Sequence, residues 1–344
     1  MPDARVGFMT HSTLLVLGGT QWLGREVAAQ AIARGYDVTC VARGESGAVP
    51  AGAELLRTDR SQANAYGQLA GRRFDFAVEV SWEPRFVAEA VAALADHVGH
   101  WTYVSTISVY DESAPPNTES SPRVEGIGWD EMADNRYSAA KVACEDATLA
   151  GRDAFIPRPG IIGGPGDVSD RLTYWPNRAA LAGDGPLLVP DASAGFVQVI
   201  DVRDLAAWML DAAQAGVTGP ANAVSPTYSI AQVVEAARVA AGHTGEMVPV
   251  SSEFLLEHGV RQSGGAGSLP LWTARKPGLV GMGEHSWERY AHTGGTWRTL
   301  EQTVADVMVQ ERERGIGRPL VSEITRDREL ELIAAARGEA AAGR

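Results

Sequence analysis

The stretch Thr13-Leu-Leu-Val-Leu-Gly-Gly-Thr-Gln-Trp-Leu-Gly24 decides the fold that this chain is expected to adopt. Its apolar half, residues 13–17, is typical of a buried parallel strand, and the glycines that follow predict a tight turn. Apolar residues then recur at helical spacing up to Arg34, Gly35 can end that helix, and residues 37–42 predict the next strand. This order of strand, turn, helix and strand is the context that a dinucleotide-binding fingerprint needs.

The glycine turn is the first candidate binding site. Its first glycines permit a tight turn, Gly24 permits the helix to pack closely on the strand, and the backbone N–H groups at the helix start would face a pyrophosphate. Position 21, where a middle glycine often stands, holds Gln21 instead. The alternative is a glycine-rich turn that binds nothing. If the turn is functional, the residues expected to bind the cofactor are Gly18, Thr20, Gln21, Trp22 and Leu23.

Strands and helices alternate to about residue 160, which predicts an α/β fold with a Rossmann-type doubly wound parallel sheet. Further elements are expected as strands at 74–80, 101–105, 153–157 and 196–200, and as helices at 85–98, 205–213, 230–241, 300–314 and within 326–344. Residues 1–165 are expected to form the dinucleotide-binding domain, with returning segments at about 196–225. Residues 166–344 are expected to form mostly a smaller substrate-binding lobe with C-terminal helices. Within it, the Gly-rich segment 243–297 carries three tryptophans.

Composition excludes several classes of function. With 344 residues, 45% hydrophobic and 21% charged, the chain has the make-up of an ordinary globular protein. It contains neither a membrane-length apolar run nor a hydrophobic signal region at its start, and its two cysteines are expected to be buried, reduced thiols, so we expect a cytoplasmic protein without membrane contact. The net charge is −13 with no basic stripe, which disfavours nucleic acid. The histidines lack metal-like spacing, so no catalytic metal is expected.

Tyr137 and Lys141 form a second informative pattern, about 120 residues downstream of the glycine turn. On a helix, residues four apart lie on the same face, so the two side chains can share one site. The ammonium would lower the pKa of the phenol, because a nearby opposite charge stabilises the ionised form. A phenol that exchanges a proton near neutral pH suits carbonyl and alcohol redox chemistry. Taken singly, Tyr137 could be an interfacial aromatic and Lys141 a solvated lysine.

Five motifs follow one another in a recognisable order: the glycine turn, residues 103–110, the Tyr137–Lys141 pair, residues 157–167 and residues 200–205. With them the chain resembles the extended short-chain dehydrogenase/reductase family, also described as the NAD-dependent epimerase/dehydratase family. The resemblance covers roughly residues 13–241. It implies a nicotinamide cofactor and a homodimer formed through helices near 85–98 and 137–149.

The resemblance also implies a catalytic set, Thr106, Tyr137 and Lys141. Thr106 is expected to end the fifth strand and to hydrogen-bond the substrate oxygen and the Tyr137 phenol, with Ser105 as the fallback. Tyr137 would exchange a proton with the substrate oxygen, while Lys141 would keep the phenol acidic and bond the nicotinamide ribose. Hydride would pass between the substrate carbon and nicotinamide C4. An ordinary strand-end hydroxyl is the alternative interpretation of Thr106.

Two departures from the family pattern narrow the chemistry. Sugar-nucleotide 4,6-dehydratases carry an acidic pair after the catalytic Thr, and this chain has Ile107 and Ser108 there. Elimination chemistry is therefore disfavoured. Many sugar-nucleotide epimerases have an Asn three residues after the Arg equivalent to Arg158, in contact with the substrate diphosphate. Here that position is Ile161, which argues against a diphosphate sugar nucleotide.

The end of the second strand predicts which cofactor is preferred. NAD-preferring sites usually place an acid there for the ribose 2′-OH, whereas this chain has Ala42 followed by Arg43. A guanidinium can bond a 2′-phosphate, so NADP(H) is favoured, with NAD(H) as the alternative. Asp59 resembles the family's adenine-contacting acid, and Pro159 is expected near the nicotinamide. Arg43 could instead be a solvated loop residue.

Substrate contacts are expected from residues 168–178, where Arg171, Tyr174 and Trp175 combine aromatic and cationic groups; surface packing is the alternative. Asp204 is interpreted as structural, as a cap for the following helix. The sequence thus predicts an NAD(P)-dependent oxidoreductase or epimerase that acts on a carbonyl or secondary alcohol of a small polar or sugar-like substrate. The competing hypothesis is a catalytically silent dinucleotide-binding regulatory protein, which Gln21 supports.

Overall fold

A computed structural model describes residues 12–111, 117–131, 133–134, 136–275 and 283–338. Contacts within the chain divide it into two compact units. The first unit consists of the residues up to Ser105 together with Glu125–Pro157 and Ala206–Pro220. The second unit consists of Thr106–Val124, Arg158–Leu205 and the residues from Ala221 onward.

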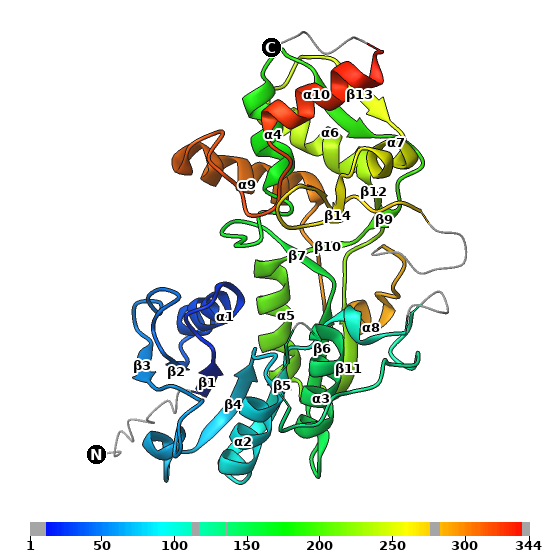
Figure 1. The fold of residues 1–344 in the computed structure, drawn as a ribbon. Coiled ribbons are helices and arrows are strands. Elements are labelled where there is room, and N and C mark those ends of the chain that lie inside the picture. The colour runs from blue at the N-terminus through cyan, green and yellow to red at the C-terminus, as the bar shows by residue number, and fades with distance from the viewer. Residues whose placement is uncertain (1–11, 112–116, 132, 135, 276–282, 339–344) are drawn as a thin grey trace. The chain divides into compact units, whose positions relative to one another are not determined.

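A seven-stranded sheet has the strand order β3-β2-β1-β4-β5-β6-β11 (Figure 1). Its strands are β1 (Thr13–Leu17), β2 (Asp37–Ala42), β3 (Glu54–Arg57), β4 (Phe74–Glu79), β5 (Val98–Tyr103), β6 (Phe155–Pro159) and β11 (Gly219–Ala223). The pairs from β3 to β6 are all parallel. The strand order reverses between β1 and β4, which is where doubly wound sheets bind their ligands. The predicted fold class is confirmed.

Helices α1 (Trp22–Ala33), α2 (Pro84–Leu94), α3 (Tyr137–Leu149) and α5 (Val202–Gln214) accompany this sheet, together with the short 3-10 helix η1 (Gly67–Leu69). The core of the first unit joins strand side chains such as Leu15 and Trp101 to the apolar face of α2, which buries Val87, Ala90 and Leu94. Both cysteines are buried free thiols, Cys40 on β2 and Cys144 on α3.

The boundaries around β5 correct two expectations. The helix predicted at 85–98 ends at Leu94, and Val98 already begins β5, where it pairs with Phe74. The apolar Val98 fits a helical spacing, but Gly99 lets β5 approach β4 so closely that a Cβ there would lie 2.9 Å from the Asp75 carbonyl oxygen. At its other end β5 stops at Tyr103, so Thr106 does not end the strand.

The second unit is built from short strands and longer helices. Its strands pair as β7 (Ile161–Gly163) with β10 (Val199–Asp201), β8 (Leu187–Pro190) with β13 (Met247–Val250), β9 (Phe196–Val197) with β12 (Tyr228–Ser229), and β14 (Arg261–Ser263) with β15 (Ser268–Pro270). Its helices are η2 (Ile107–Val109), α4 (Tyr174–Ala182), α6 (Ile230–Ala241), α7 (Ser252–Glu257), α8 (Glu288–His292), α9 (Leu300–Arg314) and α10 (Arg326–Ala336). The strand predicted at 196–200 is therefore two strands, divided at Gln198.

Helices α6 and α9 have the bounds that their sequences predict, and both begin with a capping box. Ser229 and Gln232 exchange hydrogen bonds at the start of α6, and Thr299 and Gln302 do so at the start of α9. These two helices contact each other, and α4 contacts both, around a core that includes Trp175 and Trp272. The Gly-rich segment 243–297 supplies several short elements to this unit, and its residues 276–282 lie outside the described part.

Within the described ranges, no helix is long and apolar enough to cross a membrane.

Candidate active site

The turn after β1 is packed so closely that only glycine fits at three of its positions. A Cβ on Gly18, whose φ is +103°, would lie 2.4 Å from Val80 Cγ2, and one on Gly19 would lie 2.4 Å from Cys40 Sγ. A Cβ on Gly24 would lie 2.5 Å from the Gly18 carbonyl oxygen. The glycines therefore let α1 start directly against the end of β1, as the fingerprint requires.

Helix α1 begins without a side-chain cap. Gln21 occupies the cap position with extended backbone, makes no capping hydrogen bond through its side chain, and is followed by no acidic residue in the first turn. A helix start of this kind presents backbone N–H groups and the positive end of the helix dipole to an anion. Thr20 is buried and Gln21 is exposed beside this start. The turn thus has the features of a phosphate cradle, and the Gln21 side chain does not cap the N–H groups of the helix start.

Two arginines meet at the ends of β2 and β3. Arg43 is exposed and pairs with Glu45 at 3.2 Å. Arg57 donates to the Arg43 carbonyl oxygen at 3.4 Å, and its guanidinium lies over Gly44, where a Cβ would be 2.1 Å from Nη1. Arg57 is not among the predicted cofactor contacts. The signal that could have found it is the parallel register, which pairs Ala42 with Arg57.

Asp59 follows β3 and is exposed. Its carboxylate accepts from the Ser61 backbone N–H at 2.9 Å, and this hydrogen bond is the main cause that lowers the pKa of Asp59. Arg43 acts in the same direction. Asp59 is thus an ionised acceptor in the same part of the first unit as Arg43.

Tyr137 and Lys141 lie on the same face of α3, as predicted. Tyr137 is the first residue of the helix, with 42% of its surface exposed, and its ring lies 5.8 Å from that of Trp82. Lys141 is only 3% exposed, and its Nζ lies 6.0 Å from the centroid of the Tyr137 ring. The alternative interpretation of Lys141 as a solvated surface lysine is therefore wrong.

The ammonium of Lys141 is held by backbone oxygens. Nζ donates to the Val104 carbonyl at 2.7 Å and to the Ser81 carbonyl at 3.1 Å, at the ends of β5 and β4. Burial lowers the pKa of Lys141 to about 8, because the charged form loses its hydration. An ammonium has three N–H donors, so two are used here and one can serve a ligand.

The remaining predicted residues belong to the second unit. Thr106 is buried and caps η2: its Oγ1 accepts from the Ser108 N–H at 3.1 Å and donates to Ser108 Oγ at 3.2 Å. Ser108 is thus the direct partner of Thr106. Pro159 is buried as the last residue of β6. Arg171 is partly buried, and its Nε donates to Ser169 Oγ at 3.2 Å.

Tyr174 and Trp175 do not line an open pocket, which corrects their interpretation as substrate contacts. They are 1% and 0% exposed, pack edge to face with ring centroids 5.1 Å apart, and belong to the core of the second unit. Trp175 Nε1 donates to the Pro270 carbonyl at 3.0 Å. Their polar neighbours in the sequence gave no indication that the start of α4 is apolar and buried. Asp204 is structural but is no cap, since it accepts from the Arg298 backbone and guanidinium.

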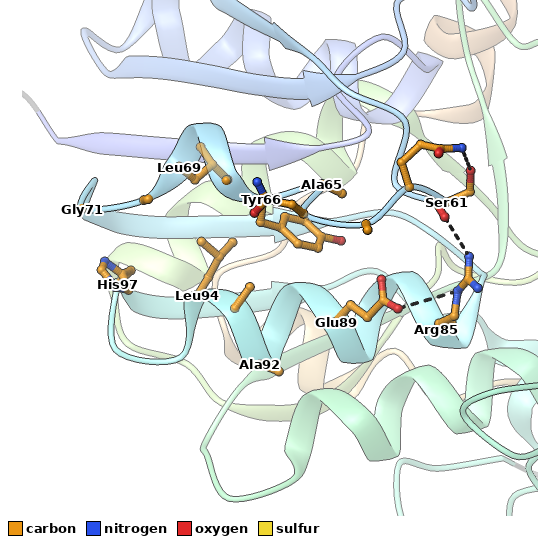
Figure 2. A pocket seen from close by; sticks show the side chains of 16 residues that line it. Ser61, Ala65, Tyr66, Leu69, Gly71, Arg85, Glu89, Ala92, Leu94 and His97 are labelled. Carbon is orange, nitrogen blue, oxygen red and sulfur yellow. Dashed lines mark hydrogen bonds and ion pairs between the residues drawn. The ribbon is translucent and has the colours of Figure 1, made fainter.

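A cavity of about 880 Å³ lies in the first unit between the segment 61–71 and α2 (Figure 2). Arg85 spans this region, with its Nε 3.8 Å from Glu89 and its Nη2 3.5 Å from the Ser61 carbonyl. None of the residues predicted for the cofactor or for catalysis lines this cavity. The cradle and the Tyr137–Lys141 pair are therefore defined by their own contacts and not by this hollow.

No protein-family model and no curated protein sequence matches this chain. Solved structures match most of its length. WbmH of Bordetella bronchiseptica, in complex with NAD+, matches with a TM-score of 0.65 at 17% identity over 89% of this chain and 100% of its own. UDP-N-acetylglucosamine 4-epimerase of Bacillus cereus matches at 0.62 and 15% identity, over 88% of this chain and 99% of its own.

UDP-glucose 4-epimerase of Thermotoga maritima, with UDP-glucose, matches with a TM-score of 0.65 at 15% identity, over 88% of this chain and 99% of its own. At these identities the likeness shows the fold. The Rossmann-type fold that the family resemblance implies is therefore confirmed, along almost the whole length of the matched chains.

The pKa of Lys141 has a measurable effect on stability. The folded chain releases this proton near pH 8, whereas an unfolded chain keeps it to about 10.5, so unfolding takes up a proton between these values and stability rises with pH there. Relative to a Lys141→Met variant, the unfolding free energy of the wild type is expected to rise by roughly 3 kcal/mol across this window. Urea denaturation of both proteins at several pH values measures it. A difference that stays constant with pH would contradict the burial of a titrating Lys141.

Proposed function

We propose that this protein is an NADP(H)-dependent oxidoreductase or epimerase acting on a carbonyl or secondary alcohol of a small polar or sugar-like substrate. One observation carries the proposal. The first unit contains both an uncapped helix start behind a glycine turn and a buried Lys141 one helical turn from Tyr137. The first feature fits a dinucleotide pyrophosphate, and the second fits proton exchange at an oxygen that gains or loses hydride.

In the proposed reaction, a bound nicotinamide supplies or accepts the hydride at C4. Tyr137 exchanges a proton with the substrate oxygen, and its exposed position at the start of α3 leaves the phenol accessible. Lys141 provides a positive charge that favours the phenolate, and its remaining N–H serves the nicotinamide ribose. Thr106 donates to the substrate oxygen, and Pro159 lies near the nicotinamide. Both of these roles rest on the order of the motifs.

The preference for NADP(H) rests on charge at the end of β2. The Arg57 guanidinium donates to the Arg43 carbonyl oxygen there, and Ala42 stands where an NAD-binding acid would be. Glu45 pairs with Arg43 and would have to yield part of that pairing to a 2′-phosphate. WbmH is a structural neighbour in complex with NAD+, so NAD(H) is the alternative that the cofactor measurement has to exclude.

The substrate class follows from what the chain lacks as well as from its neighbours. Two of the matched enzymes, those of Bacillus cereus and Thermotoga maritima, are named as epimerases, which fits transient oxidation of a secondary alcohol by the same residues. Ile107 and Ser108 replace the acids of dehydratases, and Ile161 replaces a diphosphate-contacting Asn. We therefore favour a substrate without a nucleoside diphosphate, such as a small carbonyl compound, in which Arg171 is the candidate contact.

We also propose that a second copy of the chain covers α2 and α3. A hollow of about 840 Å³ lies between these helices, lined largely by small apolar side chains and by residues 127–129. Trp129 stands at its edge with 58% of its surface exposed. Large exposed aromatics beside an apolar groove are typical of interfaces, and the same two helices are those that the family resemblance implies.

Replacement of Tyr137 by Phe tests the proposed chemistry against the silent regulatory alternative. Turnover is expected to fall by roughly 10²–10⁴-fold, because the proton-exchanging hydroxyl is lost. The affinity for NADPH should stay within about twofold, because no cofactor-binding group has changed. Steady-state kinetics with a panel of carbonyl substrates and a fluorescence titration measure the two effects. Unchanged turnover in Tyr137→Phe would exclude the proposed role of Tyr137, whereas a wild type that binds NADPH but turns over no substrate of the panel would favour the regulatory protein.

The cofactor preference is tested by Arg43→Ala and Arg57→Ala. Each should weaken NADPH binding on the order of tenfold and leave NADH binding nearly unchanged, because only NADPH carries the 2′-phosphate. Arg34→Ala, at the opposite end of α1, serves as the matched control. Tighter binding of NADH than of NADPH by the wild type would reverse the assignment.

The oligomeric state is tested by sedimentation velocity. The wild type is expected to sediment as a dimer and Trp129→Glu as a monomer, because a charge at the edge of the α2–α3 groove would be buried unpaired. Leu256→Glu changes an exposed apolar residue of α7 and should leave the dimer intact. A wild type that sediments as a monomer would exclude this interface.

A further inference from the structure

The carboxylate of Glu79, the last residue of β4, is buried at 1% exposure. A buried carboxylate is costly unless it is paired and fully hydrogen-bonded. Arg60 meets this requirement from the segment after β3, with Nη1 donating to Oε1 at 3.0 Å and Nη2 to Oε2 at 2.5 Å. The pair therefore joins the ends of two strands inside the first unit.

Arg60 is itself fixed from a second side. Its Nε donates to the Tyr66 hydroxyl at 2.9 Å, and Nη2 also donates to the Phe86 carbonyl at 2.7 Å. Tyr66 donates to the same Phe86 carbonyl at 2.9 Å. Figure 2 shows the Tyr66 side chain extending from the 61–71 segment toward α2, where its hydroxyl bonds the Phe86 carbonyl. These hydrogen bonds fix the orientation of the Arg60 guanidinium and of the Glu79 carboxylate that it binds.

Both oxygens that hold Lys141 are connected to Glu79. Its Oε1 accepts from the Ser81 N–H at 2.8 Å, which orients the chain whose Ser81 carbonyl then accepts from Lys141. Its own carbonyl accepts from the Val104 N–H at 2.9 Å, and the Val104 carbonyl is the second acceptor of Lys141. The Tyr103 hydroxyl also donates to the Ser81 carbonyl, at 3.1 Å.

We propose that Glu79, clamped by Arg60, is a positioning residue whose carboxylate holds the Ser81 carbonyl where it binds the Lys141 ammonium. The proposal rests on the proposed function, in which Lys141 serves the phenol and the cofactor, and it adds the group that holds Lys141 in place. Neither Arg60 nor Glu79 belongs to the catalytic set. Their role is to keep the third N–H of Lys141 pointing in a fixed direction.

Charge supports the same assignment. Burial lowers the pKa of Lys141, and the Glu79 carboxylate opposes this decrease. The other titratable groups that face the ammonium are Tyr103 on β5 and Tyr137, Cys144 and Glu145 on α3. Loss of the Glu79 charge alone should therefore lower the pKa of Lys141 further and shorten the pH range in which the ammonium is charged.

The chain offers an unusually direct test, because it contains only two lysines, Lys141 and Lys276. Lysine labelled with ¹³C at Cε gives two NMR signals, and Lys276→Arg assigns the one from Lys141. In the wild type the Lys141 signal is expected to titrate near pH 8. In Glu79→Gln the Lys141 signal is expected to titrate at lower pH. The decrease of kcat/KM at alkaline pH should move to the same lower pH.

Two further variants separate positioning from general damage. Arg60→Gln/Glu79→Gln removes both charges, so no unpaired charge stays buried if Glu79→Gln alone does not fold. A downward shift smaller than that of Glu79→Gln is expected, because loss of the Arg60 charge acts in the opposite direction. Glu329→Gln removes an equally buried carboxylate of the second unit, which pairs with Arg178 and Arg326, and should leave the Lys141 titration unchanged. An unchanged Lys141 titration in a folded Glu79 variant would overturn the proposal. A wild type that binds no dinucleotide would instead remove the proposed function, since the lysine titration requires no ligand.

Discussion

The approach of α1 to the end of β1 is the constraint on which the candidate site depends. Gly24 lies so close to the Gly18 carbonyl that no side chain fits between them, and Gly19 leaves no room above Cys40. This contact sets the place of the helix start, and with it the direction in which the N–H groups and the helix dipole act. The rest of the first unit adds groups around that fixed point: the arginines beside β2, and Tyr137 and Lys141 on α3.

Burial, more than proximity, distinguishes Lys141 from an ordinary helical lysine. A solvated ammonium would be charged at every physiological pH and would exert little force on a neighbouring phenol, because water screens it. Within the protein the same charge acts more strongly but is more easily lost, as the lowered pKa shows. Two strand-end carbonyls and the Glu79 carboxylate counter this loss. The Lys141 ammonium therefore acts strongly but is close to losing its proton, so small changes in its surroundings should change its charge.

Local patterns predicted what depends on local sequence. The strand bounds of β1 and β2 and the helices α6 and α9 follow from apolar periodicity, and Tyr137 and Lys141 share a face because they lie four residues apart on α3. What escaped prediction depends on pairing between distant segments. Arg57 became visible only through its register with Ala42, and the Arg60–Glu79 pair only through the contact between the segment after β3 and the end of β4. Sequence spacing contains neither relation.

The failures have physical reasons as well. Val98 satisfies a helical period, yet tertiary pairing with Phe74 places it in a strand, because Gly99 permits the close approach. Tyr174 and Trp175 lie among polar residues, which made them resemble pocket residues, although their rings fill a core. Aromatic residues serve packing and recognition equally well, so their type alone does not decide between these roles.

The position of Cys40 beneath Gly19 has a consequence for chemical reactivity. Burial raises the pKa of this thiol to about 12, so at neutral pH roughly one molecule in 10⁵ carries the reactive thiolate. Even that fraction is shielded, because the sulfur occupies the space directly under the turn. A thiol reagent can reach it only when β2 and the turn separate. The alkylation rate of Cys40 therefore reports how often the glycine turn opens locally, and this measurement needs no added probe.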